Sequence, residues 1–140
     1  NLFKNKKITK TYFAVTVGKM NSKGNINLKI DNKEAITDYE VQESVPSNRF
    51  DFLNLVKLLP KTGRKHQLRI HLSSIKNQIL GDKEHGDESL MLNGKGLYLH
   101  AYSLKFIHPF TKETVFVSKQ LPKKFTKIFS NTPHLKTTSL

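Results

Sequence analysis

The chain has 140 residues, enough for one domain with a substantial core and too few for a second large one. Lysine and arginine number 24 against 11 aspartates and glutamates, and the net charge of +13 favours an anionic partner, nucleic acid before an acidic membrane surface. Cysteine is absent, which excludes disulfides, thiolate metal sites and a cysteine nucleophile.

The first half of the chain shows the alternation that is typical of β-strands. Residues 11–18 form the first strand, in which Tyr12 lies on the face opposite Phe13, Val15 and Val17. A turn at 21–24 precedes further alternation at 26–30, which suggests a hairpin between these two segments. Residues 36–45 alternate again, and the dense apolar run 50–59 indicates a strand that is buried on both faces.

The second half continues this pattern after a helix that begins near Lys65. Residues 97–107 and 114–117 are expected to form strands, and residues 121–129 a final helix with Pro122 in its first turn. We therefore predict an α+β domain over residues 1–129, with a mixed, mainly antiparallel sheet and flanking helices. Residues 130–140, rich in Thr, Ser and Lys, are expected to form a flexible tail.

The most informative segment is the run from Lys61 to Leu72. Thr62-Gly63 indicates a turn, and the helix after it has an apolar stripe formed by Leu68, Leu72 and Ile75. At about 100° per residue, the roughly opposite side of that helix carries His66, Arg69 and Ser73. A partly buried arginine needs a carboxylate or phosphate, and no acidic residue lies near Arg69 in the sequence. Its partner must come from elsewhere in the fold or from outside the chain.

Other kinds of site are poorly supported. His66 and His71 are five residues apart, so on a helix they point about 140° apart and cannot bind one ion together. His85, in the segment Gly81 to Gly86, would need further ligands from scattered positions, and an ordinary hydrogen-bonded histidine is favoured. The sequence contains no nucleophile elbow and no phosphate-binding glycine loop. We expect no metal.

Four segments together resemble one family. The runs "KTYFAVTVG", "LPKTGRKHQLRIHL…GDKEHG", "LHAYSLKFIHPFTKE" and "LPKKF" resemble the RluA-type pseudouridine synthases, which isomerise uridine in structured RNA. The resemblance runs from about Lys10 to Phe129, with the motifs in the order and spacing of the family. It implies a cytoplasmic enzyme that acts on rRNA or tRNA and needs no organic cofactor.

The resemblance also suggests roles for individual residues. Tyr12 corresponds to the tyrosine that stacks on the target base, and Arg69 to the basic residue that pairs with the catalytic aspartate. The candidate RNA-binding residues are Lys10, Arg64, His66 and Gln67. On residue type alone, Tyr12 would more often be a packed core aromatic.

One departure from the family is serious. The nucleophilic aspartate of the family lies in a His-Arg-Leu-Asp motif upstream of the Lys-x-Tyr segment, and none of the five aspartates here has that context: Asp31, Asp38, Asp51, Asp82 and Asp87. We therefore expect the chain to be the C-terminal part of a catalytic domain, inactive by itself. The alternatives are a catalytically dead RNA-binding module and a basic protein-interaction domain unrelated to RNA.

Overall fold

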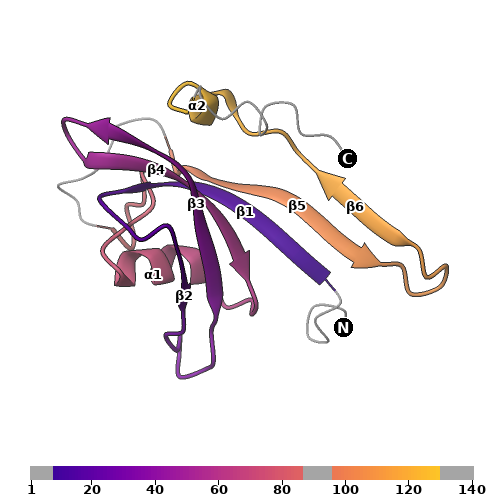
Figure 1. Ribbon diagram of the computed structural model, residues 1–140. Helices are drawn as coiled ribbons and strands as arrows, with labels where there is room; N and C mark the ends of the chain where they lie inside the picture. Colours follow the sequence, from indigo (N-terminus) through magenta and orange to yellow (C-terminus); the bar gives the residue numbers. More distant parts are fainter. Residues whose placement is uncertain (1–7, 87–95, 130–140) are drawn as a thin grey trace.

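The computed structural model describes residues 8–86 and 96–129, which form one six-stranded sheet and two short helices (Figure 1). The sheet order is β2-β3-β4-β1-β5-β6, and every strand pair in the described residues is antiparallel. The predicted α+β architecture with a mainly antiparallel sheet is confirmed. The strands are β1 (Ile8–Val17), β2 (Lys23–Ile26), β3 (Thr37–Ser47), β4 (Asp51–Pro60), β5 (Leu99–Ile107) and β6 (Thr114–Ser118).

Strand β1 lies near the middle of the sheet and is buried on both faces. Phe13 and Val15 are buried as expected, but Ala14 and Thr16, on the other face, are equally inaccessible to solvent. Both edges of β1 are occupied, by β4 on one side and β5 on the other. The predicted hairpin between the first two segments is therefore wrong, and β2 pairs with β3 instead.

Helix α1 (Gln67–Ser74) packs on one face of the sheet, against β3 and β4. Its stripe is confirmed, since Leu68 and Leu72 are buried and Ile75 packs against the core. His71 is also completely buried, where Nδ1 lies 2.8 Å from Thr37 Oγ1 and Nε2 lies 2.8 Å from the carbonyl oxygen of Leu28. His71 is therefore a hydrogen-bonded core residue.

Helix α2 (Lys123–Thr126) lies on the opposite side of the sheet (Figure 1). Phe125 is buried and packs against Tyr98 and His100, with ring centroids 5.7 and 6.3 Å apart. The helix is shorter than the predicted 121–129, because Pro122 has an extended backbone and serves as the N-cap. The predicted tail, 130–140, lies outside the described residues.

Among the described residues, no helix has the length and apolar character required to cross a membrane.

Candidate functional site

A pocket of about 360 Å³ opens where β1 passes the start of α1. All six residues that the sequence singled out line it: Lys10, Tyr12, Arg64, His66, Gln67 and Arg69. They come from two segments about 50 residues apart. Leu97 and Leu99 complete an apolar part of the wall. The fold thus brings the candidate residues to one place, and the volume lies within the roughly 300–1,000 Å³ of ligand sites.

Tyr12 reaches the pocket because of its position in β1. It is paired with Leu58 of β4 and Ala101 of β5, and a β-bulge separates it from Thr11. Because successive side chains of a strand point to opposite faces of the sheet, the side chain of Tyr12 lies on the face that α1 covers. It is partly exposed, whereas the five residues that follow it in β1 are buried. Tyr12 is therefore the last accessible aromatic residue before the core begins.

Arg69 has a partner within the chain. Its Nη2 donates to Asp82 Oδ1 at 2.8 Å and its Nε donates to Oδ2 at 3.3 Å. The carboxylate of Asp82 is completely buried, and the side chain of Arg69 is 19% exposed. The partner that could not be identified near Arg69 in the sequence thus comes from the loop between α1 and β5.

The surroundings of Asp82 keep it ionised. Burial by itself would raise the pKa of this carboxyl, but the hydrogen bond from Arg69, the backbone N–H groups of His85 and Glu84, and the charge of Arg69 together lower it. The pKa of Arg69 is raised in turn, chiefly by its hydrogen bond to Asp82. An ion pair with this many hydrogen bonds holds the guanidinium at the pocket wall.

Gln67 is also in the wall, but its amide is fully used inside the protein. Nε2 donates to the carbonyl oxygen of Ile36 and to Thr37 Oγ1, both at 2.9 Å. Oε1 accepts from Thr62 Oγ1 at 2.6 Å and from the backbone N–H of Arg64 at 3.1 Å. The side chain joins the turn before α1 to β3, and this arrangement favours a role in shaping the pocket over contact with RNA.

Arg64 and His66 also line the pocket. Arg64 Nε donates to the carbonyl oxygen of Glu34 at 2.7 Å. His66 is the N-cap of α1 and has a left-handed backbone, with φ 56°. Its Nδ1 lies 3.0 Å from His85 Nε2, in keeping with the expectation of a hydrogen-bonded histidine whose neighbouring groups come from scattered positions. The fold closes a separation of 19 residues that sequence spacing could not reveal.

A second hollow of about 440 Å³ adjoins the first along β5 and β6. Lys10 and Tyr12 line both, so the two hollows meet at these residues. Lys119 and the exposed side chain of Val117 lie in the second hollow. Sequence reasoning did not name Val117 or Asp82 as site residues, although Asp82 lies in the motif "GDKEHG".

The sequence matches the family model described as RNA pseudouridylate synthase over residues 1–74. It is 36% identical to tRNA pseudouridine synthase C of Haemophilus influenzae, over 91% of this chain and 65% of that protein. It is 33% identical to ribosomal large subunit pseudouridine synthase C of Rickettsia conorii, over 91% of this chain and 46% of that protein. The chain therefore spans about half to two thirds of the length of these curated relatives.

Solved structures agree with the sequence comparison. The fold matches human RNA pseudouridylate synthase domain containing 1 with a TM-score of 0.72 and 28% identity, over 87% of this chain and 59% of that one. It matches human RNA pseudouridylate synthase domain containing 4 with a TM-score of 0.69 and 26% identity, over 94% of this chain and 65% of that one. Most of this chain therefore shares the fold of these pseudouridylate synthase domains.

Proposed function

Because the chain belongs to the RNA pseudouridylate synthase family, we propose that the protein it forms part of isomerises uridine to pseudouridine in structured rRNA or tRNA. The observation that carries this proposal is the convergence of the six candidate residues on one pocket. We place this reaction in the cytoplasm, where rRNA and tRNA are modified in bacteria such as those of the curated relatives.

The reaction requires a uridine that has left the helical stack, at a cost of a few kcal/mol for unstacking. Tyr12 is the aromatic residue of the pocket, and we assign it to stacking on the detached uracil and to proton removal. Arg69 supplies a fixed positive charge, since Asp82 holds two of its nitrogens. Among the described residues no hydrogen bond is made by its Nη1, so this nitrogen is the one we assign to the catalytic aspartate of the family.

RNA binding is the second part of the proposal. Lys10 and Arg64 are cationic and line the pocket from different elements, one on β1 and one before α1. With a net charge of +13, the protein is expected to bind RNA with a steep dependence on salt. We propose that Lys10, Arg64 and His66 bind the phosphates that flank the target uridine.

The test compares two proteins on transcripts of tRNA and rRNA, with pseudouridine mapped by chemical derivatisation and primer extension. One is the 140-residue chain, which contains no His-Arg-Leu-Asp motif. The other includes the upstream coding sequence. We expect modification only with the longer protein, while both bind RNA. Modification by the 140 residues alone would overturn the assignment of a separate aspartate.

A second candidate is a catalytically dead RNA-binding module, which would keep the pocket and the net charge of +13 without a catalytic aspartate. The same experiment separates the two: salt-sensitive RNA binding by the longer protein without pseudouridine on any transcript supports the module.

A further inference from the structure

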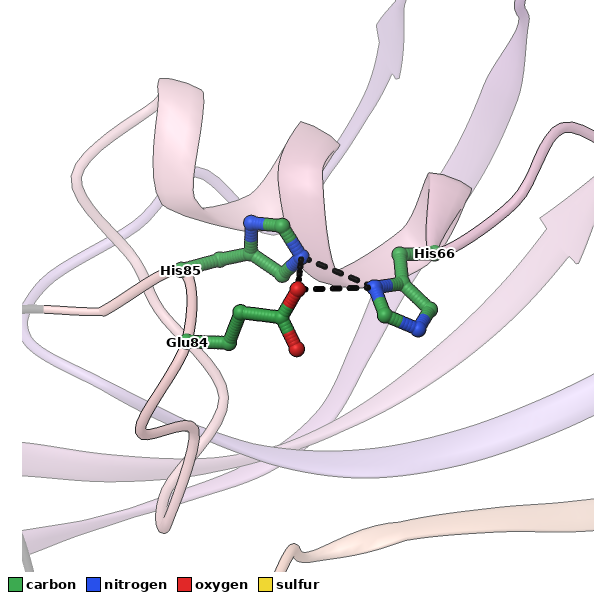
Figure 2. Close-up of side chains that lie close together, drawn as sticks. All are labelled: His66, Glu84 and His85. Carbon is green, nitrogen blue, oxygen red and sulfur yellow. Dashed lines mark hydrogen bonds and ion pairs between the residues drawn. The ribbon is translucent and has the colours of Figure 1, made fainter.

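A cluster of two imidazoles and one carboxylate lies at the start of α1, beside the pocket. His66 Nδ1 lies 3.0 Å from His85 Nε2, and Glu84 Oε2 lies 3.6 Å from the first and 3.7 Å from the second. Figure 2 shows the three side chains turned toward one another, with the dashed lines closing a triangle. His66 is the N-cap residue of α1, and the other two come from the loop after this helix.

The size of this triangle fits a single metal ion. A point about 2.0 Å from all three atoms lies at its centre, and Zn²⁺ binds histidine nitrogen and carboxylate oxygen at ~2.0–2.2 Å. An ion slightly above the plane would have the three ligands of a tetrahedron and a fourth position open to water. We propose that His66, Glu84 and His85 bind one divalent transition-metal ion, with Zn²⁺ as the representative.

The loop that carries two of the ligands is held in place before any ion arrives. Asp82 Oδ1 accepts the backbone N–H of Glu84 at 3.1 Å and that of His85 at 3.0 Å. Ser73 Oγ of α1 donates to the carbonyl oxygen of His85. A Cβ on Gly86 would overlap the side-chain amide of Gln78 and approach the Asp82 carbonyl oxygen to 2.7 Å, so the tight path of the loop requires glycine.

Protonation and charge are also compatible with a cation. Two facing imidazole nitrogens at 3.0 Å can share one proton between them, and an ion that binds both nitrogens takes the place of that proton. Glu84 supplies a negative charge through Oε2, while its Oε1 lies 3.8 Å from Arg69 Nη2. The charge of Arg69 is balanced by the buried carboxylate of Asp82, which reduces its repulsion of an ion at the cluster.

Calorimetric titration of the untagged protein with Zn²⁺, and visible absorption of its Co²⁺ complex, test the site. We expect one ion per chain and the strong visible bands of four-coordinate Co²⁺. Glu84→Gln and His85→Asn should each weaken binding by at least about tenfold, the loss that even an outer partner of a metal ligand causes. His108→Asn, at an exposed turn between β5 and β6, is the matched control and should bind as the original protein does.

A second measurement needs no variant and so does not depend on how the variants fold. Long-range ¹H–¹⁵N spectra resolve the two nitrogens of each imidazole, and Zn²⁺ should shift Nδ1 of His66 and Nε2 of His85 while the signals of His100 and His108 stay in place. Shifts at other histidines, no shift at His66 and His85, or equal affinity in His85→Asn and the original protein would each overturn the proposal. None of these readouts depends on pseudouridine formation.

Discussion

Arg69 and Asp82 form a two-point ion pair that joins α1 to the loop after it, with Nη2–Oδ1 at 2.8 Å and Nε–Oδ2 at 3.3 Å. Because Asp82 also accepts two backbone N–H groups, this one buried carboxylate organises both the pocket wall and the proposed metal ligands. Arg69 is held rigidly, and rigid placement of a charge is what an electrostatic role in catalysis requires.

Asp82→Asn should therefore destabilise the fold strongly. Breaking a buried pair by removing one partner leaves the other charge uncompensated, and the expected loss in the free energy of unfolding is about 3–5 kcal/mol. Urea denaturation measures it. The matched control is Asp38→Asn, whose 3.6 Å pair with Lys61 is exposed and should contribute only ~0–1 kcal/mol. Equal effects of the two substitutions would contradict this account of Asp82.

Gln67→Leu should lower stability, and Arg64→Ala should lower RNA affinity. The leucine would remove four hydrogen bonds, each worth about 0.5–1.5 kcal/mol net, so we expect a loss of at least about 2 kcal/mol. Arg64→Ala removes one hydrogen bond to a backbone carbonyl and should cost under about 1 kcal/mol. Denaturation and RNA titration on both variants separate the roles. A fully stable Gln67→Leu variant would show that its hydrogen bonds are dispensable.

Lys10→Ala should reduce the salt dependence of RNA binding. If its ammonium group contacts a phosphate, the slope of log K against log salt should fall by about 1. Lys33→Ala is the control, because Lys33 is exposed in a turn and lines neither hollow. Fluorescence anisotropy with a structured RNA at several salt concentrations gives both slopes. If Lys33→Ala lowered the salt slope and Lys10→Ala left it unchanged, the RNA would bind to another surface of the protein.

Tyr12→Phe, made in the longer protein that includes the upstream coding sequence, should preserve RNA binding and slow pseudouridine formation. The ring remains for stacking, while the hydroxyl to which we assign proton removal is lost, and such steps contribute about 100-fold or more. Single-turnover rates measure the effect. Tyr39→Phe is the control, since Tyr39 is buried on the same face of the sheet but does not line the pocket. An unchanged rate of pseudouridine formation in Tyr12→Phe would show that the hydroxyl of Tyr12 is not needed for proton removal.

Local patterns in the sequence predicted which residues are buried, but they did not predict which strands are neighbours. Alternation identified β1, and the apolar run at β4 correctly indicated a strand that is buried on both faces. The order of the strands could not follow from it, because backbone hydrogen bonds between strands do not depend on side-chain identity. The sequence therefore suggested a hairpin in which the segment after β1 pairs with β1. In the structure, β1 pairs with β4 on one edge and with β5 on the other.

The sequence by itself determined the charge, the apolar stripe of α1 and the motifs that mark the family, since these depend on residue type and spacing along the chain. Only the tertiary structure decided that Arg69 meets Asp82 and that His66 meets His85. These contacts depend on how the loop after α1 reverses direction, through the backbone N–H groups that Asp82 accepts and the absence of a side chain at Gly86. A chain reversal of this kind has no periodic signal, so its partners become visible only in the folded protein.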